Sequence, residues 1–353
     1  MPLVSRRRRR LARPGLWFLA LLIAFLIAAN FAVSWAKTRL VAMDPSDVRP
    51  VDVIIPSGAS AFDIGRLLRT RGVVRDERVF NYYARYRGLD QKLKSGEYEL
   101  TRQMNVAQIL DKLTRGQVVT YSFTVPEGFT VIQVADLLAK KGYADRERFL
   151  AVARSPELSR GAAPSGVPVK EPLEGHLFPE TYQIQRGTTE EEIVKMMMDR
   201  LETVFKPEYR LRAQELGLSL HQVLTLASII EKEATAADRD LVSAVFHNRL
   251  KRGMKLDSCA TLNYVIENPK LILTNKDLET PSPYNTYKNA GLPPGPIANP
   301  GEAAIRAALW PAKVDYLYFV VKPDETQAFA TTYEEHLANR ARYQSDISPG
   351  SQP

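Results

Sequence analysis

The sequence has few of the residues that serve covalent and metal chemistry. Its 353 residues include one cysteine and four histidines. No intramolecular disulfide can therefore form, and packing must stabilise any domain that lies outside the cytoplasm. The histidines show no H-E-x-x-H or other ligand spacing, and no G-x-S-x-G, G-x-G-x-x-G or phosphate-loop motif is present. We therefore expect no metal, no cofactor and no nucleophile triad.

An excess of positive over negative charge is also nearly absent beyond the N-terminus, although the formal net charge is +8. Residues 1–37 carry seven basic side chains and no acid, so subtracting seven from +8 leaves +1 for residues 38–353. A nearly neutral folded part offers no surface for tracking phosphates, which argues against a nucleic-acid partner.

Long hydrophobic runs are absent with one exception, residues 14–36, where 23 residues carry no charge. A helix of about 20 apolar residues spans the hydrocarbon core of a bilayer. Tryptophans lie near both ends of the run, and arginines 6–10 precede it. A cleavable signal peptide is the alternative, but the run is long and residues 34–36 are a poor cleavage signal. We predict a basic cytoplasmic tail at 1–13, an uncleaved transmembrane helix at 14–36, and the rest of the chain outside.

Residues 51–80 and 121–150 form an internal repeat at a constant offset of 70. Each copy predicts a short strand, a proline–glycine turn, an amphipathic helix that ends at glycine, and a second helix. A strand at 96–100 and a helix at 104–113 are predicted between the copies. Such units resemble LysM modules, which bind glycans containing N-acetylglucosamine, and a duplicated scaffold without a ligand is the alternative. The matched positions are Pro56 with Pro126, Gly58 with Gly128, Leu67 and Leu68 with Leu137 and Leu138, and Gly72 with Gly142.

The C-terminal part predicts helices, one buried strand and two loops. The helices are expected at 188–205, 237–251 and 336–343, the strand at 317–321, and the loops at 155–169 and 281–299. The second loop carries tyrosines and asparagines, whose rings and amides suit sugar rings and hydroxyls. The predicted fold class is α+β, with an N-terminal transmembrane helix, a LysM-like α+β subdomain and a mixed α+β catalytic domain.

The stretch 218–233 is where we expect the chemistry. Ser219 starts a capping box, and apolar residues then repeat at helical spacing. The next place on that face is Glu231, which follows the uncharged run 226–230. A carboxylate that continues an apolar stripe lies in a poorly solvated site, where its pKa rises and it can act as a general acid. A solvated helix end is the alternative.

Four blocks resemble the endolytic murein transglycosylase family, also called MltG or YceG-like, and the resemblance runs from about residue 51 to residue 343. The blocks are LEGHLFPETY at 173–182, LTLASIIEKEA at 224–234, VFHNRLKRGMKL at 245–256 and TPSPYNTYKNAGLPPGPIANPG at 280–301. The resemblance implies one membrane helix, a LysM-like subdomain and a catalytic domain. We place the subdomain at 50–118, the YceG-like catalytic domain at 119–345 and a disordered tail at 346–353.

The resemblance implies a lytic transglycosylase that cleaves the β-1,4 bond between N-acetylmuramic acid and N-acetylglucosamine in nascent glycan strands and leaves 1,6-anhydromuramoyl ends. The family's catalytic glutamate falls on Glu231, which would act as general acid and then as base. Cys259 stands where many members carry an aspartate, which argues against a second catalytic carboxylate at that position. The candidates for substrate binding are Glu174, Asn248, Ser258, Tyr264, Tyr284 and Asn285.

The expected partners are peptidoglycan glycan strands and the lipid bilayer, the latter through residues 14–36, with peptidoglycan synthases as candidate protein partners. The expected location is the bacterial cytoplasmic (inner) membrane, with the catalytic domain on the periplasmic side. A non-catalytic, membrane-anchored peptidoglycan-binding scaffold protein is the alternative, since the repeat and the anchor would serve it equally well. The intact Glu-Lys-Glu block and the tyrosine–asparagine loop favour the enzyme.

Overall fold

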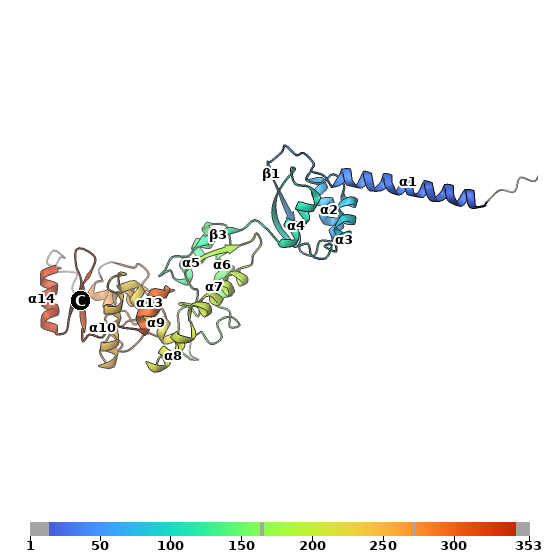
Figure 1. Cartoon of the computed structure of the whole chain (residues 1–353). Coiled ribbons are helices and arrows are strands. Elements are labelled where there is room, and N and C mark those ends of the chain that lie inside the picture. The colour runs from blue at the N-terminus through green and yellow to red at the C-terminus, as the bar shows by residue number, and fades with distance from the viewer. Residues whose placement is uncertain (1–13, 163–165, 271–272, 344–353) are drawn as a thin grey trace, which may run out of the picture. The chain divides into compact units, whose positions relative to one another are not determined.

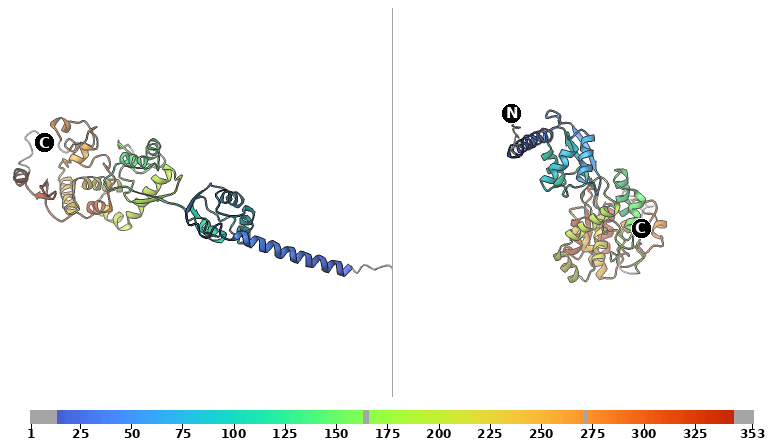
Figure 2. Two further views of the ribbon diagram at one scale, coloured as in Figure 1. Left: turned by 90° about the horizontal axis from the view of Figure 1, so that it is seen from above. Right: turned by 90° about the vertical axis from the view of Figure 1, so that its right-hand side faces the viewer.

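The computed structural model describes residues 14–162, 166–270 and 273–343. The chain divides into two compact units, Met1–Tyr121 and Ser122–Pro353, whose elements are labelled in Figure 1 and seen from two further sides in Figure 2. The predicted tails at 1–13 and 346–353 lie outside the described residues.

Helix α1 (Pro14–Leu40) is the apolar helix that the N-terminal run predicts. Its segment Trp17–Leu40 has 24 residues with a mean hydropathy of 2.3, and none of its apolar window is buried inside the protein. Elsewhere in the described ranges, no helix is long and apolar enough to cross a membrane. These properties are compatible with a single-pass membrane anchor.

The first unit packs three helices against a two-stranded antiparallel sheet of β1 (Pro50–Ile55) and β2 (Gly96–Thr101), in which Val53 lies opposite Tyr98. The helices are α2 (Ala61–Thr70), α3 (Glu77–Tyr86) and α4 (Val106–Arg115). Each buries one apolar side in a single cluster, which includes Leu68 of α2, Phe80 of α3 and Leu110 of α4. This unit therefore has a hydrophobic core of its own.

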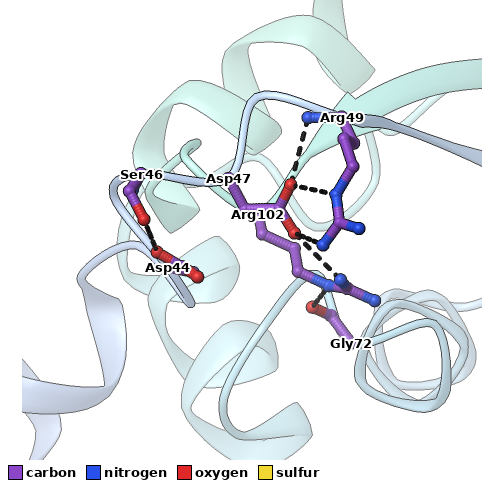
Figure 3. Close-up of polar contacts among 6 residues, drawn as sticks. All are labelled: Asp44, Ser46, Asp47, Arg49, Gly72 and Arg102. Carbon is purple, nitrogen blue, oxygen red and sulfur yellow. Dashed lines mark hydrogen bonds and ion pairs between the residues drawn. The ribbon is translucent and has the colours of Figure 1, made fainter.

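The segment that joins α1 to β1 is tied to the first unit by polar contacts. The buried carboxylate of Asp47 accepts hydrogen bonds from Arg49 at 2.8 Å and from Arg102 at 3.0 Å (Figure 3). Arg75 donates to the backbone carbonyl oxygens of residues 42 and 43, both at 2.9 Å. These contacts fix residues 42–49 to the folded unit.

The internal repeat is present in the structure. The strand β3 (Tyr121–Thr124) and the helices α5 (Val131–Lys140) and α6 (Arg146–Ala153) follow one another as β1, α2 and α3 do. The turn glycines Gly58 and Gly128 have φ of +76° and +75°, a backbone region that glycine adopts without steric strain. In the second copy, β3 pairs with β4 (Thr181–Ile184). The repeat does not by itself establish a LysM fold, so the glycan-binding interpretation stays a prediction.

The second unit is built around helix α9 (Leu220–Glu233), in which the eight residues Val223–Ile230 are all buried. The helices α7 (Glu190–Val204), α8 (Pro207–Glu215), α10 (Arg239–Lys251) and α13 (Glu302–Leu309) share its core cluster. Figure 1 shows α8, α10 and α13 beside α9, with which each is in contact. The antiparallel strands β5 (Tyr318–Val321) and β6 (Gln327–Ala330) contact the terminal helix α14 (Tyr333–Tyr343).

The predicted mixture of helices and strands is confirmed, and the longer predicted elements correspond to α7, α10, β5 and α14. The described residues of the loops predicted at 155–169 and 281–299 contain no helix or strand. The prediction missed β4, α8, α13, β6 and the short helices α11 (Cys259–Asn263) and α12 (Asn275–Leu278). All six span fewer than ten residues, so each offers little periodic pattern.

Candidate active site

Helix α9 carries Glu231 to the edge of the core. The predicted capping box is present, because the Ser219 side chain accepts from the Gln222 amide and the Gln222 side chain accepts from the Ser219 amide. The buried run ends at Ile230, and the side chain of Glu231 is 8% exposed. Glu231 therefore lies in a poorly solvated position and not on a solvated helix end.

Two donors hold the carboxylate of Glu231. The backbone N–H of Gly301 donates to Oε2 at 3.1 Å, and Arg239 Nη2 donates to Oε1 at 3.3 Å. Gly301 is the N-cap of α13, and the dipole of a helix favours negative charge at this end. Arg239 opens α10, and its Nε is buried without a hydrogen-bond partner among the described residues. The guanidinium therefore has an unused donor beside Glu231.

A second carboxylate, that of Glu127, faces the same arginine. Its Oε2 lies 3.9 Å from Arg239 Nη2, and half of its side chain is exposed. Burial, followed by the negative charge of Glu231, raises the pKa of Glu127 above the ordinary value for glutamate. The guanidinium of Arg239 thus faces the carboxylates of both Glu127 and Glu231.

The turn that carries Glu127 is fixed to the loop before α13. The amide of Gly128 donates to the carbonyl of Asn299 at 2.9 Å, and the amide of Asn299 donates to the carbonyl of Phe129 at 2.8 Å. A Cβ atom added to Gly301 would lie 2.0 Å from Glu127 Oε1. A glycine at the N-cap of α13 therefore leaves room for the Glu127 carboxylate.

Glu174 lies in a separate, buried cluster. Its Oε1 accepts from the Val131 amide at 3.0 Å, and its Oε2 accepts from the Tyr264 hydroxyl at 3.0 Å. Burial raises the pKa of Glu174 to about 8, so this carboxyl is largely protonated at neutral pH. The ring of Tyr264 lies 5.2 Å from that of Tyr284. The cluster thus ties the start of α5 to residue 264.

The second glutamate of the Glu-Lys-Glu block, Glu233, holds the start of α11. It accepts hydrogen bonds from the Ser258 hydroxyl and from the Ala260 amide, the latter at 3.2 Å. Burial of its carboxylate raises the pKa of Glu233. Cys259 Sγ lies 2.9 Å from the hydroxyl of Tyr287. Glu233 is therefore a structural link between α9 and α11.

A comparison with protein families shows which family this chain belongs to. The model of the YceG-like family matches residues 53–342. The chain belongs to the YceG-like family. The endolytic murein transglycosylase of Bacillus subtilis (strain 168) is 35% identical over 325 residues, covering 88% of this chain and 90% of the relative. That of Streptococcus pneumoniae (serotype 2, strain D39) is 33% identical over 359 residues, covering 92% of this chain and 64% of the relative.

A solved structure agrees with this membership. The crystal structure of a yceG-like protein from Listeria monocytogenes is 38% identical in sequence and superposes with a TM-score of 0.56. The match covers 82% of this chain and 99% of that chain. The YceG-like fold therefore extends over most of the present chain.

Four predicted substrate-binding side chains of this YceG-like protein are buried, each at most 3% exposed: Glu174, Ser258, Tyr284 and Asn285. Asn285 Nδ2, for example, donates to two backbone carbonyl oxygens at 2.9 Å. Their polar atoms have protein partners in this structure, and the substrate-binding interpretation of these four stays a prediction. Asn248 and Tyr264 are partly exposed, and Asn248 Nδ2 donates to the carbonyls of Val314 and Tyr316.

Sequence reasoning missed Glu127, Arg239 and Gly301. The available signal for Glu127 was the repeat, in which the turn of the first copy carries Ser57 at the matched position. Arg239 and Gly301 have no local signal, because packing alone brings them to Glu231. In the described part of this YceG-like chain, no group of three or more His, Cys, Asp or Glu side chains is placed to hold a metal ion.

Proposed function

We propose that this chain is an endolytic murein transglycosylase that acts on peptidoglycan glycan strands with Glu231 as its acid–base residue. One observation carries the proposal. The Glu231 carboxylate follows the buried run Val223–Ile230 of α9, is 8% exposed, and is held by an arginine and a helix N-terminus. Such a group is fixed in direction and poorly solvated, as a proton-transferring side chain must be. The names of the curated relatives support the same reaction and substrate.

The proposed reaction breaks one C–O bond and forms another without consuming water. A proton passes from Glu231 to the O4 of N-acetylglucosamine as its bond to C1 of N-acetylmuramic acid breaks. The muramoyl C6 hydroxyl then attacks C1, and its proton passes back to Glu231. The product ends in a 1,6-anhydro ring, and the glutamate is regenerated in its starting form.

The remaining predicted residues belong to this proposal as positioning groups. The buried ones hydrogen-bond to neighbouring segments of the second unit, while Tyr264 and Asn248 have partly exposed side chains. A misplacement of about 1 Å in such supports can reduce turnover substantially. The group comprises Glu174, Asn248, Ser258, Tyr264, Tyr284 and Asn285.

We infer that α1 anchors the chain in the cytoplasmic membrane, with residues 1–13 in the cytoplasm and both units on the outer side. The exposed apolar surface of α1 and the arginines before it support this orientation. Within this proposal, residues 50–118 form a LysM-like glycan-binding subdomain and residues 119–345 form the catalytic domain, with peptidoglycan synthases as candidate partners.

The test is the full chain with Glu231→Gln, incubated in detergent with purified sacculi and analysed by mass spectrometry for anhydromuropeptides. Glutamine keeps the size and hydrogen bonding of glutamate but cannot shuttle a proton. We expect the rate to fall by about 10²–10⁴, the usual contribution of a positioned acid–base group, with sacculus binding retained.

Glu180→Gln is the matched control, because Glu180 is a partly exposed glutamate of the same unit that also pairs with one arginine, Arg200. It should retain the unmodified rate. Near-normal activity of the Glu231 variant would contradict the assignment. A wild-type chain that binds sacculi and releases no anhydromuropeptides would favour the non-catalytic scaffold protein.

A further inference from the structure

The site contains a second acid that the reaction scheme above does not use. Glu127 and Glu231 lie against the same nitrogen, Arg239 Nη2, at 3.9 Å and 3.3 Å. Arg239 carries one positive charge and can balance one carboxylate at a time. Two carboxylates that share one cation retain a proton more readily than either would alone, because the second negative charge is unfavourable.

The surroundings distinguish the two acids. Glu231 receives the stronger set of donors, the Gly301 amide and Arg239, and both stabilise an ionised carboxylate. Glu127 has the longer contact to Arg239, its carboxylate packs against Gly301, and half of its side chain is open to solvent. Burial and the negative charge of Glu231 raise the pKa of Glu127, so the surroundings of Glu127 favour its protonated form. The proposed reaction requires a proton on Glu231 when the glycosidic bond breaks.

We propose that Glu127 is the proton partner of Glu231 and supplies the proton that Glu231 delivers to the glycosidic oxygen. This inference rests on the proposed function. The O–H bond of Glu127 breaks and an O–H bond forms on Glu231, directly or through one water molecule. Arg239 then balances the charge left on Glu127. When Glu231 later takes the proton of the C6 hydroxyl, the reverse transfer restores the starting state. Glu127 does not touch the substrate in this scheme. It acts through Glu231 and is therefore a positioning residue, which places the proton on Glu231.

The repeat supports a special role for this side chain. The turns at 56–58 and 126–128 have the same glycine conformation, with φ of +76° and +75°. The first copy carries Ser57, and a Cβ on Gly58 would meet no atom within 4 Å. In the second copy, a Cβ on Gly128 would lie 3.6 Å from Glu231 Cγ. The carboxylate thus occurs in the copy whose turn packs against α9, and the turn itself does not require it.

Charged groups from three elements lie around Glu127. Helix α9 contributes Glu231 and Lys232, whose Cδ lies 3.5 Å from the Cβ position of Gly128, and α10 contributes Arg239. On α13, the carboxylate of Glu302 is occupied by the Tyr209 hydroxyl and Lys206. Removal of Glu127 takes away a negative charge beside Glu231 and leaves Arg239 in contact with it, a change that favours the ionised form of a carboxyl group.

The experiment measures anhydromuropeptide formation between pH 5 and pH 9 by the full chain and its variants. Glu127→Gln should lower the rate about tenfold or more and move the decline at high pH to lower pH, because Glu231 loses both its proton source and its like-charged neighbour. Glu127→Ser should behave in the same way, since the first copy shows that serine fits this turn. Glu127→Asp keeps a titratable group and should retain part of the rate.

Glu180→Gln and Glu231→Gln are run in parallel. If Glu231→Gln is inactive while Glu127→Gln keeps the wild-type rate and pH profile, the proton-partner role is overturned and the proposed function stands. If Glu231→Gln remains active, the proposed function itself fails. A lower rate of Glu127→Gln with an unmoved pH profile would show a purely structural role and would also overturn the inference.

Discussion

The glutamate carboxylates of the second unit differ in their solvent exposure and in the groups that contact them. Glu174 is buried, and its polar contacts are to donors of the protein itself, as are those of Glu233. Glu127 is half exposed and faces another carboxylate. The side chain of Glu231 is 8% exposed, and its carboxylate shares Arg239 with that of Glu127. The proposed chemistry therefore uses Glu127 and Glu231, whereas the hydrogen bonds of Glu174 and Glu233 hold neighbouring segments together.

Glu174 gives a prediction for the pH dependence of stability. Its pKa is about 8 in the folded chain, against an ordinary value of 4.5. Between these values the unfolded chain releases a proton that the folded chain keeps, so this group makes folding less favourable as pH rises from 4.5 to 8. The side chain of Glu174→Gln cannot ionise, so at pH 8 this variant should melt at a higher temperature than wild type. The expected gain in the free energy of unfolding at pH 8 is on the order of a few kcal/mol. At pH 4 no such gain is expected.

The measurement is calorimetry of the full chain in detergent at pH 4, 6 and 8. Glu215→Gln, an exposed change on α8, serves as the control because it leaves no buried carboxyl altered. A Glu174→Gln variant that is less stable than wild type at every pH would show that the hydrogen bonds of the carboxyl outweigh its ionisation.

The helix pairs of the two repeat copies differ in the residue at one matched buried position. In the first copy, Gly65 of α2 faces α3, and a Cβ at this position would lie 2.9 Å from the carbonyl oxygen of Glu77 and 3.0 Å from Phe80. The matched residue of the second copy is Ala135, which is fully buried. One element pattern therefore produces two different helix–helix contacts, according to whether a methyl group separates the backbones.

Gly65→Ala should loosen α2 and α3. Alanine is the better helix former by about 1 kcal/mol, but overpacking typically costs about 1–3 kcal/mol, so we expect a net loss of stability. Hydrogen exchange of the amides in residues 61–86 should become faster. Arg66→Ala, on the exposed side of the same helix, is the control and should leave exchange within a few-fold of wild type. Slower exchange in Gly65→Ala would contradict this account of the packing.

The whole molecule combines one strongly apolar helix with two folded units of opposite formal charge, +4 for residues 38–121 and −3 for residues 122–353. The contacts of Asp47 and Arg75 attach residues 42–49 to the first unit. Helix α1 also touches this unit, because Leu40 packs against its core and α1 contacts α3. The exposed apolar window of α1 is not buried against the folded part of the chain.

Removal of residues 1–40 should release the protein from membranes. The remaining fragment keeps the segment 42–49 and its contacts, so the first unit should retain its fold. We expect the fragment to stay in the supernatant when it is sedimented with vesicles of phosphatidylglycerol and phosphatidylethanolamine, while the full chain sediments with them. Vesicle binding by the fragment that survives a high-salt wash would instead place a further membrane contact in the folded units.

The sequence by itself determined the features that depend on neighbouring residues. The apolar length of α1, the glycine turns of the repeat, and the capping box and buried run of α9 are local patterns, because each follows from spacing along a few turns of chain. Glu231 was predicted from such a pattern together with the family resemblance. The pairing of Glu231 with Arg239, Gly301 and Glu127 was decided by the tertiary structure alone. Those residues come from separate turns and helices, and their charges act on one another only once packing has removed the water and fixed the distances between them.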